Sequence, residues 1–161
     1  MLVLSDNRPL IESNAILWYL AKGTRYLPDD PVGQAEVVRW LIYEQADVMP
    51  SIGGLRFRLV TGRLAADSPE AEARRRNAYD VLRILDTHLA TRDFLVADRY
   101  TIADLAVFAY AHTASEAEID TTSYASFEEW IARVRDQPAF VDDLEPYPPN
   151  ASLQVGRSIY G

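Results

Sequence analysis

Glu12 and Ser13 stand where a helix is predicted to begin, and a helix start can hold a charged ligand. They lie in the stretch RPLIESNAILWYLA, where two short extended runs joined by the turn SDNR give way to helical spacing from Ile16 to Leu20. Ser13 is therefore predicted to be the N-cap of a helix. The free N–H groups of a helix N-terminus, together with a capping hydroxyl, suit a carboxylate. The plainer interpretation is that Ser13 only caps its own helix, because serine caps are routine.

A second charged residue, Asp104, lies within the otherwise apolar segment YTIADLAVFAYAH. Thr101 precedes it by three residues, and this spacing predicts a capping box, in which the two side chains satisfy opposite ends of the first helical turn. We therefore expect Asp104 to be structural. The helix that it starts is apolar on almost every side, which predicts that this helix runs through the middle of a bundle.

Composition excludes several classes of function. With 16 Lys and Arg against 24 Asp and Glu, the net charge is -8, which argues against a nucleic acid or an anionic membrane as partner, since both are bound by basic surfaces. There are no cysteines and only two histidines, far apart in the sequence, so no metal site is expected. The first residues lack the basic segment and the apolar run of an export signal. We therefore expect a globular cytoplasmic protein.

The chain divides at the linker TRYLPDDPVG. Before the linker we expect a strand, a turn, a second strand and one helix that ends at Gly23, a residue suited to the position after a helix. After the linker every segment has helical spacing. The sequence therefore predicts two domains, over residues 1–27 and 28–161.

A long amphipathic helix is predicted over residues 32–61, with a kink at Pro50. The pair Gly53-Gly54 weakens this helix but permits a close approach by another chain or a ligand. The predicted buried stripe consists of apolar residues at helical spacing, namely Val38, Leu41, Ile42, Val48, Ile52, Leu55 and Leu59.

Two further helices have clear signals. Ser68-Pro69 is a helix-start signature, and the helix that it begins should run to about Leu89. Another helix is marked by Phe127, Trp130, Ile131 and Val134. A short helical turn over 139–144 and an extended tail are expected to follow it.

The chain resembles the glutathione transferase superfamily in the order and spacing of its segments. These are ESNAI, YLA, LPDDP, WLIYEQ, LVADRYTIADLAVFAYAH and FEEWIARVRDQPAF, which together cover nearly the whole chain. The resemblance implies a mainly α fold, in which the all-helical C-terminal domain of a glutathione transferase follows a partial thioredoxin-like piece made of a β-hairpin and a helix. It also implies glutathione as co-substrate, a small hydrophobic electrophile as second substrate, no metal, and a homodimer.

The resemblance assigns roles to three polar residues. Glu12 and Ser13 match the motif that binds the γ-glutamyl end of glutathione, with Glu12 facing the ammonium and Ser13 the carboxylate. Asp47, in YEQAD, resembles an acid that some members extend across the dimer interface to the same ammonium. The alternative for Asp47 is a solvated acid on a helix.

Three further residues could line the pocket for the electrophile. Met49, Gly53 and Phe57 recur at four-residue spacing, so they share one side of the predicted helix. A stripe of methionine and aromatic residues is more often plain core, and that alternative stays open.

In the family, a strand, a helix, a second strand and a further helix precede the strand that MLVL resembles, with a cis-proline just before it. The thiol-activating Tyr, Ser or Cys belongs to that part, so we expect this chain to be inactive alone. When the part is present, the implied reaction lowers the thiol pKa of glutathione so that its thiolate attacks an electrophile. The competing hypothesis is a non-catalytic helical module for binding or dimerisation.

Overall fold

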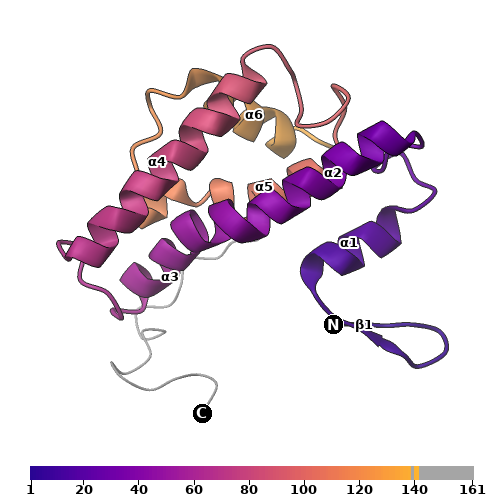
Figure 1. Ribbon diagram of the computed structural model, residues 1–161, viewed down its shortest axis with the longest axis horizontal. Coiled ribbons are helices and arrows are strands. Elements are labelled where there is room, and N and C mark those ends of the chain that lie inside the picture. The colour runs from indigo at the N-terminus through magenta and orange to yellow at the C-terminus, as the bar shows by residue number, and fades with distance from the viewer. Residues whose placement is uncertain (139, 142–161) are drawn as a thin grey trace.

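The computed structural model describes residues 1–138, 140 and 141 (Figure 1). Apart from residues 140 and 141, the turn predicted over 139–144 and the tail after it lie outside the described residues. The chain begins with two short strands, β1 (Leu2–Val3) and β2 (Pro9–Leu10), which pair antiparallel with Leu2 opposite Leu10. Helix α1 (Ser13–Ala21) follows. The predicted hairpin and helix are confirmed, and Gly23 adopts φ 75 just beyond the helix.

All the later elements are helical. They are α2 (Pro31–Tyr43), the wide π-helix η1 (Glu44–Gly53), α3 (Gly54–Val60), α4 (Pro69–Leu89), α5 (Ile102–Ala111), the short 3-10 helix η2 (Ala114–Ala117) and α6 (Ala125–Arg135). The prediction of a mainly α fold is confirmed. The predicted start of α4 is also confirmed, because the Ser68 hydroxyl accepts a hydrogen bond from the Ala71 amide at 3.1 Å.

Helix α5 forms the centre of the bundle, as predicted. It lies behind α2 in Figure 1, and most of its side chains are buried. It packs against α2, η1 and α6. The apolar faces predicted for α4 and α6 also point into this core, namely Ala78, Val81, Leu82, Leu85 and Leu89 on α4 and Phe127, Trp130, Ile131 and Val134 on α6.

The prediction of one long helix over residues 32–61 is confirmed in extent, because the helical backbone continues from Pro31 to Val60, with a π-helical stretch around Pro50. The segment divides into α2, η1 and α3, and Val38 and Ile42, both predicted to be buried, are 39% and 62% exposed. Trp40 and the charged Glu44 are also buried, together with four residues of the predicted stripe, Leu41, Val48, Ile52 and Leu55. A count of apolar residues alone includes the exposed Val38 and Ile42 and misses a glutamate at an inward position.

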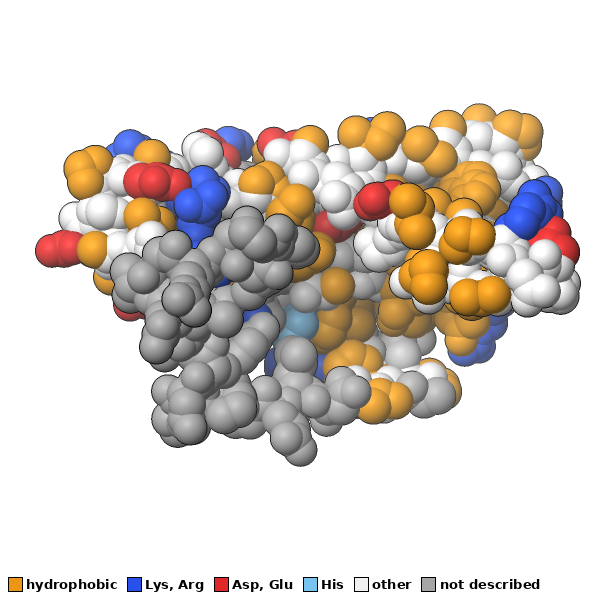
Figure 2. All heavy atoms as spheres, turned by 90° about the horizontal axis from the view of Figure 1, so that it is seen from below, with side chains coloured by type: hydrophobic (Ala, Val, Ile, Leu, Met, Phe, Trp, Pro, Cys, Tyr) orange, Lys and Arg blue, Asp and Glu red, His pale blue; other side chains and the backbone are white. Residues whose placement is uncertain are grey.

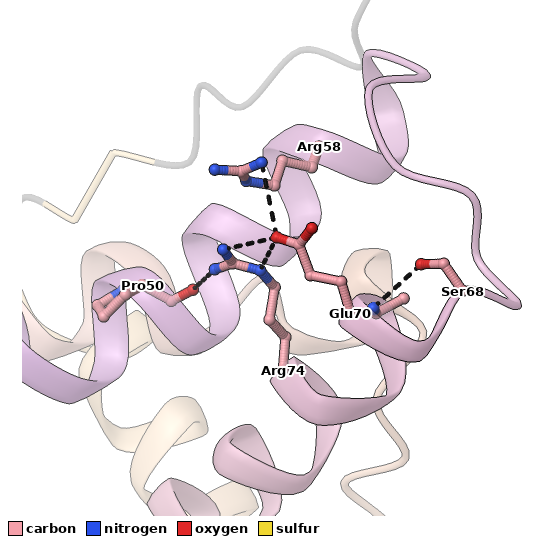
Figure 3. Close-up of polar contacts among 6 residues, drawn as sticks. Pro50, Arg58, Ser68, Glu70 and Arg74 are labelled. Atoms are coloured by element: carbon pink, nitrogen blue, oxygen red, sulfur yellow. Dashed lines mark hydrogen bonds and ion pairs between the residues drawn. The ribbon is translucent and has the colours of Figure 1, made fainter.

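An arginine holds η1 against α4. The Arg74 guanidinium donates to the Pro50 carbonyl at 3.1 Å and to Glu70 at 3.0 and 2.9 Å, and Arg58 approaches the same carboxylate at 3.7 Å (Figure 3). Pro50 has no N–H and interrupts the regular ladder of backbone hydrogen bonds. The contact with Arg74 gives the Pro50 carbonyl a donor from outside its own helix.

The capping box at the start of α5 is confirmed, and it is larger than predicted. The Thr101 amide donates to Asp104 at 2.9 Å, and the Thr101 hydroxyl accepts from the Ala103 amide at 3.2 Å. The buried Asp104 carboxylate also accepts from the Leu95 amide at 2.9 Å and from the Trp130 indole at 3.0 Å. Burial raises the pKa of Asp104, while these hydrogen bonds act in the opposite direction.

The peptide group of Leu95 extends this network to α2 and α4. Its carbonyl accepts from the Trp40 indole at 3.2 Å and lies 2.9 Å from Nε2 of His88. Because a carbonyl only accepts, Nε2 of His88 carries a hydrogen. Burial lowers the pKa of His88. One loop residue therefore bonds side chains from α2, α4 and α5, and Asp104 links it to Trp130 on α6.

Candidate functional site

Ser13 is not an N-cap, contrary to prediction. It is the first residue of α1, and the residue before it, Glu12, has φ 69 and ψ 122 and makes no capping hydrogen bond. A positive φ is unusual for a residue with a side chain and is often found at functional sites. This conformation of Glu12 brings the helix start one residue earlier than the pattern indicates. The first N–H groups of α1 have no partner within the helix, and the side chains of Glu12 and Ser13 are exposed.

The next residue, Asn14, attaches this helix start to η1. Its amide donates to the Leu41 carbonyl at 3.1 Å and to Oε2 of Glu44 at 2.7 Å. Glu44 is only 1% exposed, and Gln45 donates to the same oxygen at 2.9 Å. The other oxygen, Oε1, has no hydrogen-bond partner among the described residues. The sequence analysis missed Glu44, although its spacing of seven residues from the buried Val37 would have placed it inward.

Asp47 lies in a groove between η1 and α4 rather than beside the start of α1. The groove has a volume of about 400 Å³ and is also lined by Tyr43, Arg74 and Asp80. Burial, together with the charges of Asp47 and Asp80, raises the pKa of Tyr43 to about 12. Ser13 is not among the residues that line this groove.

Met49, Gly53 and Phe57 are all partly exposed, and none belongs to the buried core. Gly53 packs directly against the ring of Tyr110 on α5. A close approach does occur at Gly53, but the group that makes it is α5 of this chain and not the other chain or ligand that was predicted. The sequence analysis did not single out Tyr110, because only the tertiary packing brings it to Gly53.

The described residues contain no group of three or more His, Cys, Asp or Glu side chains arranged to hold a metal ion. Nor does any helix within them have the length and apolar character needed to cross a bilayer.

Comparisons with known proteins agree with this arrangement. Residues 40–138 match the family "Glutathione S-transferase, C-terminal domain". A crystal structure of a glutathione S-transferase from Pseudomonas fluorescens is 34% identical, with a TM-score of 0.83 over 88% of this chain and 71% of that one. A glutathione transferase from Pseudomonas putida, solved with one glutathione disulfide bound per subunit, is 27% identical, with a TM-score of 0.70 over 81% and 60%.

One similar protein is named an elongation factor rather than a transferase. Elongation factor 1-gamma of Artemia salina is 29% identical over 139 residues, which cover 83% of this chain and 31% of that protein. The chain therefore spans less than a third of the length of this relative. The family match covers more than half of the chain, and the Pseudomonas fluorescens structure is covered over more than two thirds of its length. The chain belongs to the glutathione S-transferase family.

Proposed function

We propose that this chain forms the γ-glutamyl subsite and part of the electrophile pocket of a glutathione transferase. The observation that carries the proposal is the N-terminus of α1, where no side chain caps the helix and Glu12 and Ser13 are exposed. Helices α2, α4 and α5 are each capped by a side chain, from Asp30, Ser68 and Thr101, whereas the N-cap residue of α6, like that of α1, makes no side-chain cap. The open start of α1 can instead bind the carboxylate of glutathione, with Glu12 facing its ammonium. The Pseudomonas putida relative binds glutathione disulfide.

The electrophile is proposed to lie against η1 and α3, beside Met49, Gly53 and Phe57. The partial exposure of these side chains supports this role over plain core. Asp47 is proposed to reach the glutathione of a second copy in a homodimer. The exposed apolar residues Val38 and Ile42, on the same stretch of helix, support an interface there.

The proposed reaction is attack of the glutathione thiolate on the electrophile. None of the residues assigned above can lower the thiol pKa from the γ-glutamyl end, so a separate segment must supply the activating hydroxyl or thiol. The role of this chain is to bind and orient the two substrates.

The second candidate function is a non-catalytic binding or dimerisation module. It is favoured by the similarity to a protein named an elongation factor rather than a transferase. In that case the α1 terminus would not bind glutathione.

Calorimetric titration with glutathione and an assay with a chromogenic electrophile separate the two functions. We expect weak glutathione binding and no conjugation above background for the 161-residue chain, and both at full strength when a thioredoxin half is joined in frame. In the joined protein, Ser13→Ala should weaken glutathione binding by about 1–3 kcal/mol, because a hydrogen bond to a charged group is lost. Ser5→Ala, in the exposed hairpin turn, is the matched control. Failure of the joined protein to bind glutathione would favour the non-catalytic module.

A further inference from the structure

Glu44 is a buried carboxylate that takes no part in the ligand contacts proposed above. It is the first residue of η1 and is only 1% exposed. Its Oε2 atom accepts hydrogen bonds from the side-chain amides of Asn14 at 2.7 Å and Gln45 at 2.9 Å, whereas Oε1 has no partner among the described residues. A buried carboxylate with an unpaired oxygen costs stability. Its presence at this position therefore calls for a role beyond packing.

The bond to Asn14 attaches the start of α1 to the bundle. Asn14 uses both of its amide hydrogens, because it also donates to the Leu41 carbonyl at 3.1 Å. The two acceptors belong to α2 and η1 and lie 27 and 30 residues further along the chain. Helix α1 and the hairpin lie at one side of the bundle (Figure 1), so these bonds hold the first turn of α1 in place. The bond to the carboxylate is the shorter of the two, and a bond to a charged group is the stronger kind.

The turn that is held in this way is the one proposed to bind the ligand. The backbone ladder of α1 begins with the bond from the Ile16 amide to the Glu12 carbonyl at 3.0 Å, so the amides of residues 13–15 point out of the helix end. No cap sets their direction, because Glu12 makes no capping hydrogen bond. Asn14 is the middle residue of the three, and its attachment to Glu44 sets the direction instead. Amides bind a carboxylate best when they already point toward one place.

We propose that Glu44 is a positioning residue for the γ-glutamyl subsite. Through Asn14 it holds the free amides of α1 in the direction in which they bind the carboxylate of glutathione. The proposal rests on the function proposed above and adds a residue that lies 30 positions beyond Asn14 in the sequence. Glu44 is buried and does not itself touch the ligand. Without its bond to Asn14, fewer molecules have the helix start correctly oriented, and the apparent affinity falls by that fraction.

The bond can be broken at Asn14, and Gln45 provides a matched control. Titration of the full chain with glutathione at millimolar concentrations, followed through the amide NMR signals of residues 13–16, measures affinity without turnover. Asn14→Ala should weaken binding about five- to tenfold. Gln45→Ala removes the other hydrogen bond to the same oxygen but leaves α1 attached, so the affinity should stay within about twofold. A merely structural role of Glu44 would make no such difference between the two variants.

Two changes at Glu44 separate its hydrogen bonds from its charge. Glu44→Gln keeps an acceptor for Asn14 and Gln45 and places its NH2 group at the unpaired oxygen, so it should preserve the affinity. Glu44→Met fills a similar volume without an acceptor and should weaken binding as much as Asn14→Ala does. The double variant Asn14→Ala/Glu44→Met should bind no more weakly than the weaker single variant, because both changes break the same bond.

The inference would be overturned if Asn14→Ala kept the full affinity, or if Gln45→Ala lost as much. This comparison decides the question even if Glu44→Met fails to fold. Binding by Glu44→Gln as weak as that by Glu44→Met would also overturn it, because the charge would then matter rather than the hydrogen bond, and so would losses that add in the double variant. All these outcomes leave the proposed function standing, since the unaltered chain binds glutathione. If the unaltered chain showed no shift of the α1 amides, the proposed function would fail and this inference with it.

Discussion

Replacement of Asp104 by alanine should destabilise the protein far more than the loss of an ordinary helix cap. The change leaves three buried N–H groups without an acceptor, those of Leu95, Thr101 and the Trp130 indole. Each unsatisfied buried donor costs about 1–3 kcal/mol, and removing a buried carboxylate from a poorly solvated place offsets part of the sum. We expect a loss of about 3–5 kcal/mol in the free energy of unfolding, against about 1 kcal/mol for a cap alone.

Urea melts of the two proteins measure this difference. Asp80→Ala is the control, because Asp80 is an exposed acid on α4 that only pairs with Arg83 at 3.1 Å, and its loss should change stability by less than about 0.5 kcal/mol. If Asp104→Ala shifted the unfolding free energy by only about 1 kcal/mol, the bonds to Leu95 and Trp130 would not contribute as the structure indicates. The reasoning would then be refuted, although the capping box itself would stand.

Two further predictions concern pH and association. Burial lowers the pKa of His88 in the fold from its ordinary 6.5, so unfolding takes up a proton between the folded pKa and 6.5. The contribution of His88 to stability should be highest above pH 6.5, fall as the pH drops from 6.5 toward the folded pKa, and level off below it. Urea midpoints between pH 5 and 8 should show this loss, and His88→Gln should remove it. The chain should also self-associate, because β1 and β2 leave unpaired edges and Ile11 and Leu20 are 61% and 56% exposed. A monodisperse monomer in light scattering at high concentration would contradict this expectation.

Ile11 and Leu20, on which the predicted self-association rests, belong to the N-terminal part of the chain that contains the hairpin and α1. Hydrophobic side chains gather over the hairpin and α1 at the right of Figure 2. Met1, Val3 and Tyr19 belong to the same part of the chain and are each more than half exposed. Such a surface on a protein of this size is typical of a place where another segment or chain packs.

Local signals predicted the helices well where they were strong. Ser68-Pro69 located the start of α4, and the pair Thr101 and Asp104 located the start of α5, because caps act through neighbouring residues. The family pattern also identified the fold before any contact was known. These features depend on interactions between residues that are close together in the sequence.

The features that the sequence pattern did not predict depend on the three-dimensional structure rather than on neighbouring residues. Glu44 is buried because Asn14, thirty positions earlier, donates to it, and no local pattern predicts that pairing. The positive φ of Glu12 moved the helix start by one residue, which a list of preferred capping residues cannot show. Tyr110 entered the candidate site only through its packing on Gly53, although the glycine pair had indicated that something would approach closely there.

The peptide group of Leu95 has a consequence for how the molecule opens. Loops normally fluctuate independently of the core, and their amide hydrogens exchange with solvent quickly. This loop residue, however, is bonded on one side to Asp104 and on the other to Trp40 and His88. We expect its amide to be released when the contacts of this loop with α2, α4 and α5 separate. We therefore expect the amide hydrogen of Leu95 to exchange with solvent as slowly as those of the helical core. The loop is held rigidly to the bundle and does not act as a hinge.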